Sequence, residues 1–76
     1  MTELELMRDF GENLKSLLDE WGMSQQELAD EIDVGKSTIS KYINGTGMPS
    51  LVNVINIAYV LECNIEELID IDFIRK

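Results

Sequence analysis

The chain has 76 residues, of which 45% are apolar, and this is enough for one small hydrophobic core. Its 15 acidic residues outnumber its 6 basic ones and give a formal net charge of −9. This balance argues against an indiscriminate nucleic-acid binder or a membrane-surface protein, because both need a basic surface. We therefore expect one domain over residues 1–76, with its core at about 7–70 and an acidic and apolar tail over 70–76.

The composition also bears on compartment and chemistry. No apolar run approaches the roughly 20 residues of a membrane span, the first residues do not resemble a secretion signal, and one cysteine cannot form an internal disulfide. With no histidine and only Cys63, the commonest general bases and metal-ligand sets are missing. We expect a cytoplasmic protein that is not an enzyme and has no cofactor, metal site, small-molecule ligand or membrane partner.

The first predicted element is an amphipathic helix over about residues 3–20. Thr2 and Glu5 have the spacing of a capping box, and Gly22 provides a left-handed stop. Apolar residues recur at steps of three and four, as one face of a helix requires. This stripe, which we expect in the core, consists of Met7, Phe10, Leu14, Leu17, Leu18 and Trp21.

Two short helices follow. Ser24 and Glu27 repeat the capping-box spacing and begin a helix of about two turns. Gly35 precedes a third helix over 36–43, and Asn44 and the glycine after it mark its end.

Two more helices complete the chain. Ser50 begins a fourth helix whose apolar residues we also expect in the core: Leu51, Val54, Ile55, Ala58 and Leu61. Asn64 and Glu67 have the capping-box spacing for a fifth helix. Five helices with short connections predict an all-α domain.

Charge is distributed unevenly along the chain. The 28 residues Val34–Leu61 contain no acidic residue and carry Lys36 and Lys41, a balance of +2. The other 48 residues hold all 15 acidic residues and 4 basic ones, a balance of −11. The acid-free segment can face a polyanion, or it can be uncharged because the fourth helix is buried. Burial explains 51–61 well but explains the polar residues 35–47 poorly.

Residues 24–44 have the geometry of a helix-turn-helix unit, because a tight turn joins two short helices. The turn contains Asp33 and Gly35, which tolerate unusual backbone angles. Apolar residues fall where the two helices need contacts, and we expect these residues in the core: Leu28, Ala29, Val34, Ile39 and Tyr42.

Here the chain resembles the phage-repressor family (Cro/C1-type, Xre) over roughly residues 7–70. The residues that carry the resemblance are Ser24-Gln25-Gln26-Glu27-Leu28-Ala29-Asp30, Val34-Gly35-Lys36-Ser37-Thr38-Ile39-Ser40-Lys41-Tyr42, Asn44-Gly45, Pro49-Ser50-Leu51, Ile57-Ala58 and Asn64-Ile65-Glu66-Glu67-Leu68. The resemblance implies a compact five-helix lambda-repressor-like fold with the helix-turn-helix at helices two and three. It further implies a transcriptional repressor that binds operator double-stranded DNA as a homodimer on an inverted repeat.

The resemblance also assigns roles by position, with the third helix lying in the major groove. The residues implied to contact bases are Lys36, Ser37, Thr38 and Lys41. The residues implied to contact the DNA backbone are Gln25, Ser40, Asn44 and Thr46. Thr46 would donate from its hydroxyl and its backbone amide, and the amino end of the second helix adds a favourable dipole for a phosphate.

Three features depart from the family pattern. Asp33 stands where relatives often have glycine, and we expect it to adopt the left-handed conformation. The loop 45–48 lacks the Lys or Arg of many relatives, which predicts weaker and less salt-dependent binding. In the tail, Phe73 and Ile74 would be poorly covered in a monomer, so we expect them at a dimer interface.

An alternative function remains open on the same fold, an acidic protein–protein interaction module or antitoxin-like regulator. The acidic surface can orient the protein on DNA by repelling it elsewhere, or it can serve a protein partner. Crowding of the Lys36 face by Glu27, Asp30 or Glu31 would favour the protein partner.

Overall fold

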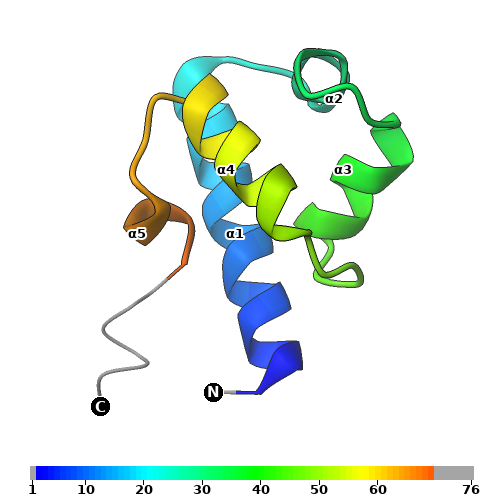
Figure 1. The fold of residues 1–76 in the computed structure, drawn as a ribbon, viewed down its shortest axis with the longest axis vertical. Coiled ribbons are helices and arrows are strands. Elements are labelled where there is room, and N and C mark those ends of the chain that lie inside the picture. The colour runs from blue at the N-terminus through cyan, green and yellow to red at the C-terminus, as the bar shows by residue number, and fades with distance from the viewer. Residues whose placement is uncertain (1, 70–76) are drawn as a thin grey trace.

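The computed structural model describes residues 2–69 and confirms the all-α prediction (Figure 1). The five helices are α1 (Glu3–Trp21), α2 (Gln25–Glu31), α3 (Lys36–Ile43), α4 (Leu51–Val60) and α5 (Ile65–Leu68). Figure 1 shows α1 as the long central helix with α4 in front of it, α2 and α3 on one side, and α5 on the other. The predicted tail contacts Phe73 and Ile74 lie outside the described residues.

The helices begin and end at the residues that the capping signals in the sequence predicted. The Thr2 hydroxyl accepts from the backbone N–H of Glu5 at 3.2 Å, and Gly22 ends α1 with φ 66°. Ser24 and Glu27 form a complete capping box, each accepting the other's backbone N–H at 3.0 Å. These signals were readable from the sequence because they connect residues only three apart.

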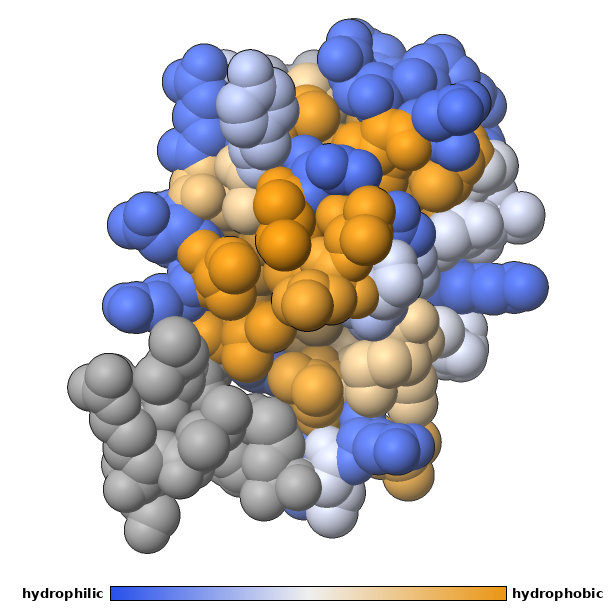
Figure 2. Space-filling model, viewed as in Figure 1, coloured by the Kyte–Doolittle hydropathy of each residue, from blue (hydrophilic) through white to orange (hydrophobic). Residues whose placement is uncertain are grey.

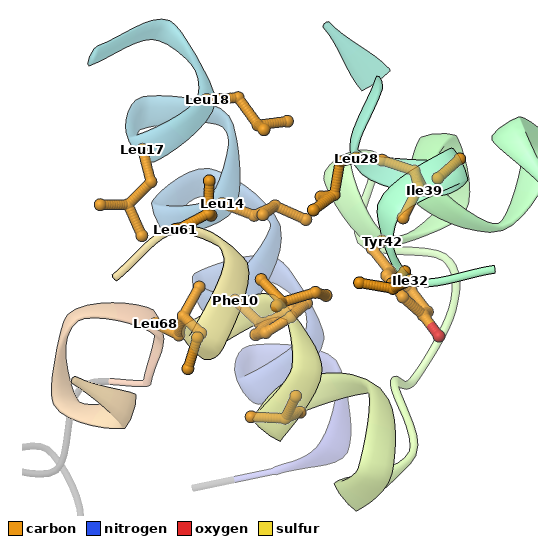
Figure 3. Packing of buried hydrophobic residues seen from close by; sticks show 14 residues of the cluster. Phe10, Leu14, Leu17, Leu18, Leu28, Ile32, Ile39, Tyr42, Leu61 and Leu68 are labelled. Carbon is orange, nitrogen blue, oxygen red and sulfur yellow. The ribbon is translucent and has the colours of Figure 1, made fainter. Parts of the chain in front are cut away.

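All five helices contribute to one hydrophobic core. Figure 3 shows Phe10 of α1 near its middle, with Leu61 and Leu68 on one side and Tyr42 on the other. The rings of Phe10 and Tyr42 meet edge to face with centroids 5.8 Å apart, a favoured aromatic arrangement. The predicted core position of Tyr42 is therefore confirmed. The buried core residues are Phe10, Leu14, Leu17, Leu18, Leu28, Ala29, Ile32, Ile39, Tyr42, Val54, Ile57, Ala58, Leu61 and Leu68.

Three residues expected in the core are exposed: Trp21, Leu51 and Ile55. Trp21 is 49% exposed, because it is the last residue of α1 and the chain turns away at Gly22 immediately after it. The apolar residues of α4 were expected to be buried, yet Leu51 and Ile55 are exposed. Helix α4 is apolar apart from Asn53 and Asn56, and it buries only the face of Val54, Ile57 and Ala58 in the core, so among the described residues most of its other apolar side chains stay exposed.

Candidate nucleic-acid interface

The turn between α2 and α3 fixes the angle between these two helices. Asp33 adopts φ 58°, the left-handed conformation expected of it. The next residue, Val34, donates its backbone N–H to the carbonyl of Ala29 at 2.9 Å, and this bond closes the turn against α2. Gly35 then precedes α3 with an extended backbone and accepts from the N–H of Thr38 at 3.0 Å. The sharp change of direction predicted from the sequence is thus formed.

Helix α3 is amphipathic over its two turns. Ile39 and Tyr42 are buried in the core, whereas Lys36, Ser37 and Lys41 are exposed. Residues three and four apart on a helix share a face, so the exposed residues form a continuous polar stripe that includes the partly buried Ser40 and ends at the exposed Asn44. Thr38, the fourth predicted base contact, is half-buried near the start of the helix.

A hydrogen bond ties the start of α2 to the middle of α3. The Ser40 hydroxyl donates to Oε1 of Gln25 at 2.7 Å, in a partly buried position. The sequence predicted both residues as DNA-backbone contacts but did not predict that they touch, since 15 positions separate them. This bond leaves the Gln25 amide nitrogen with two protons to donate, which suits a phosphate oxygen.

The end of α3 departs from the prediction at Thr46. The backbone amides of Thr46 and Gly47 both donate to the carbonyl of Lys41, at 2.9 and 3.2 Å. The Thr46 amide therefore satisfies the end of α3 and is not the phosphate donor expected from the sequence. The Thr46 hydroxyl lies 3.4 Å from the same carbonyl, and its side chain is exposed.

Two contacts outside the predicted set hold α3 in place. A Cβ atom on Gly11 of α1 would meet the carbonyl oxygens of Tyr42 and Ile43, so α1 and α3 cross here in backbone contact. From the other side, Nδ2 of Asn53 in α4 donates to the Tyr42 hydroxyl at 2.8 Å. Sequence reasoning missed both residues, because a glycine within a helix and an asparagine within an apolar helix carry no local signal of a distant partner.

A further cation lies beside the predicted backbone contacts. Lys15 of α1 borders a cavity of about 260 Å³ together with Ser24, Gln25 and Ile43, and Asp19 lies on the same cavity. Leu18 and Met23 complete its lining. Lys15 was not in the predicted set, and its position nine residues before the α2 cap Ser24 is compatible with a solvated lysine or with a phosphate contact.

The carboxylates of α2 bear on the alternative function. Glu27 accepts the backbone N–H of Ser24, and Asp30 accepts from Nε2 of Gln26 at 2.9 Å. Glu31 borders a different cavity, shared with Tyr59 and Cys63 near the end of α4. The first two carboxylates are thus hydrogen-bonded to α2 residues or their cap, and the third faces the end of α4.

Among the described residues, no helix is both long and apolar enough to cross a membrane. The helix-turn-helix family model HTH_3 matches residues 14–68, which covers α2 to α5 and the second half of α1. The chain belongs to this family. Its fold is that of a phage-repressor-like helix-turn-helix domain, as the sequence resemblance implied.

The similar proteins include a transcriptional repressor, a transcriptional regulator and a restriction-modification controller protein. The transcriptional repressor RstR of the cryptic phage CTXphi from Vibrio cholerae is 40% identical over 45 residues, which are 59% of this chain and 40% of that repressor. The restriction-modification controller protein C.AhdI from Aeromonas hydrophila superposes with a TM-score of 0.77 at 31% identity, covering 82% of this chain and 94% of C.AhdI.

A transcriptional regulator of the same family from Vibrio cholerae has a TM-score of 0.82 at 22% identity, a likeness of fold. The superposition covers 93% of this chain and 40% of that protein. This chain thus spans less than half the length of RstR and of the Vibrio cholerae regulator.

Proposed function

We propose that this protein is a sequence-specific double-stranded DNA-binding transcriptional regulator, a repressor, that reads the major groove with α3. The observation that carries the proposal is the exposed polar stripe of α3, where Lys36, Ser37 and Lys41 project from a segment without any carboxylate. Lysine donates to O6 and N7 of guanine, and serine pairs with several base edges. Thr38 is a fourth base contact from the first turn of the helix.

Backbone contacts flank this stripe in the proposal. The Gln25 amide nitrogen, oriented by the bond from Ser40, donates to one phosphate, and Asn44 donates to another beyond the end of α3. The Thr46 hydroxyl and the Lys15 ammonium group add contacts on either side. Phosphate contacts fix the orientation of α3 but carry no sequence information.

The strong negative charge of the rest of the chain supports a specific rather than an indiscriminate binder. With −11 outside Val34–Leu61, DNA is repelled from most of the surface and approaches α3 alone. The repressor RstR and the controller protein C.AhdI support a regulatory role. We further propose a cytoplasmic homodimer on an inverted repeat, without catalytic activity or cofactor, in which residues 1–76 act as one domain.

The test is a selection from randomised duplex DNA at low salt, followed by sequencing of the bound pool. We expect enrichment of an inverted repeat with half-sites about one helical turn apart. No enrichment by the folded protein would refute specific DNA binding and favour the protein-interaction alternative.

Variants of two lysines then separate base contacts from phosphate contacts. Lys36→Gln is expected to weaken operator binding about 10-fold or more while leaving binding to random DNA nearly unchanged. Lys15→Gln is expected to weaken both and to lower the salt slope by about one. Leu4→Glu, which makes the same change in net charge at a 68% exposed position near the start of α1, serves as the control. Equal losses on operator and random DNA for Lys36→Gln would contradict its role in reading bases.

A further inference from the structure

The outer face of α4 is an apolar surface that the rest of residues 2–69 leaves exposed. Its stripe consists of Leu51, Val52, Ile55 and Tyr59, at helical steps of one, three and four residues. Leu51 is 73% exposed and Tyr59 is 83% exposed. Figure 2 shows hydrophobic side chains gathered over the region that α4 occupies in Figure 1. Side chains of this size form a patch of several hundred Å², the scale of an interaction site.

An apolar cavity of about 210 Å³ lies at one end of this stripe. Its lining is Leu6, Phe10, Met48, Pro49, Leu51, Val54 and Ile69. Leu51 belongs to both the stripe and the cavity, so the two form one continuous apolar surface. The large exposed ring of Tyr59 projects at the opposite end, eight residues or about 12 Å further along the helix.

We propose that the occupant of this surface is a second copy of the same chain, with the two α4 helices packed antiparallel about a two-fold axis at Ile55. Ile55 is the midpoint between Leu51 and Tyr59, so the two-fold axis places each Tyr59 opposite Leu51 of the second copy. Each tyrosine ring then covers the cavity of the other chain. In an isologous interface each chain presents the same surface to the other, so the projecting Tyr59 ring and the cavity at Leu51 must lie at equal distances from the axis.

Charge favours a second copy at this place. Two chains of net charge −9 repel each other, and the repulsion is weakest where both present uncharged surface. Helix α4 contains no charged residue over Leu51–Val60, and it lies within the acid-free segment. Electrostatic repulsion between two acidic copies is therefore weakest when they approach through the α4 stripe.

The area is also of the right order. A stable interface buries about 800 Å² per partner. The stripe supplies a large part of this area, and Met48 and the rest of the cavity rim supply more.

In the view of Figures 1 and 2, α3 lies to the side of the hydrophobic patch, so pairing through α4 leaves the polar stripe of α3 uncovered. The consequence for the operator rests on the proposed function: the same two-fold axis would make the operator an inverted repeat.

Sedimentation equilibrium of the full chain without DNA tests the interface separately from DNA binding. At tens of micromolar we expect a mass near twice the 8.7 kDa of one chain. Leu51→Glu and Tyr59→Ser should each raise the dimer dissociation constant about 30-fold or more, because the two-fold axis makes each substitution remove the proposed Tyr59–Leu51 contact twice. Leu4→Glu, which exposes the same new charge elsewhere, should leave the dimer intact. Helical circular dichroism checks that every variant is folded.

A cross-link tests the axis itself. In a Cys63→Ser background, Ile55→Cys should give a disulfide-linked dimer under mild oxidation, because residue 55 lies opposite its own counterpart. Leu4→Cys in the same background should not.

Three results would overturn the proposal. The first is a monomeric wild-type chain at this concentration. The second is a dimer that persists in folded Leu51→Glu and Tyr59→Ser. The third is a dimer lost only in the double variant Phe73→Ser, Ile74→Ser, which would assign the interface to the tail. Each can occur whether or not the protein binds an operator, so failure here is distinguishable from failure of the proposed function.

Discussion

The contact between Gly11 and α3 gives two opposite expectations for the variant Gly11→Ala. Considered as a residue of α1 alone, alanine should stabilise the helix by about 1 kcal/mol relative to glycine. In the folded chain, however, the added methyl group meets two backbone carbonyl oxygens of α3, with the Ile43 oxygen 2.7 Å from the new Cβ. Backbone carbonyls cannot rotate away as a flexible side chain can, so α3 must move relative to α1.

We expect the steric term to exceed the propensity term. Overpacking of a well-packed contact costs about 1–3 kcal/mol, and here the obstacle is backbone. A net loss of about 2 kcal/mol corresponds, for a domain of this size, to a fall in melting temperature of roughly 10 °C. Because α3 carries the proposed base contacts, operator affinity of the folded variant should fall as well.

Urea and thermal unfolding followed by helical circular dichroism, at one fixed protein concentration, measure this effect. Glu12→Ala is the matched control, since Glu12 is the exposed neighbour on the same helix and its substitution should change stability by less than about 0.5 kcal/mol. If Gly11→Ala is stabilised by about 1 kcal/mol, as helix propensity alone predicts, the close crossing of α1 and α3 is refuted.

Three further substitutions or modifications test other parts of the structure. Tyr42→Phe removes the acceptor for the partly buried Asn53 amide and should cost about 1–2 kcal/mol in urea unfolding, whereas no change would contradict that bond. Glu62 adopts φ 50°, so Glu62→Gly should stabilise by about 1 kcal/mol, while Glu12→Gly in the interior of α1 should destabilise by a similar amount; equal signs would refute the backbone argument. Burial, reinforced by a nearby carboxylate, raises the pKa of the Cys63 thiol, so iodoacetamide should modify the folded chain more slowly than the urea-unfolded chain at mildly alkaline pH. The same shift means that any stability Cys63 contributes is lost as pH rises through the alkaline range, because the unfolded thiol ionises first.

Local signals account for the parts of the fold that the sequence predicted. The caps at Thr2, Ser24 and Asn64 involve residues three apart, and the left-handed turn at Asp33 depends on one residue. The exposed and buried sides of α3 followed from its own pattern, because polar and apolar residues alternate with helical period there.

Contacts between distant residues account for what was missed. Gly11 lies more than 30 positions from Tyr42, and Gln25 lies 15 positions from Ser40, so neither contact leaves a trace in local spacing. Trp21 had the right spacing for the core stripe of α1, but its exposure depends on where the neighbouring helices end.

Helix α4 shows why the acid-free segment needed the structure for its interpretation. The sequence offered burial as one reason for the absence of carboxylates from 51–61, and burial accounts for only one face of this helix, that of Val54 and Ile57. On the exposed face a carboxylate at Leu51 or Tyr59 would meet no steric obstacle, so burial in the monomer cannot be the reason for its absence. Two separate constraints explain the segment better. In the two proposals made above, DNA excludes carboxylates from α3, and a second copy with net charge −9 excludes them from the outer face of α4. A charge placed on either helix should therefore act on a different equilibrium, DNA binding for α3 and self-association for α4.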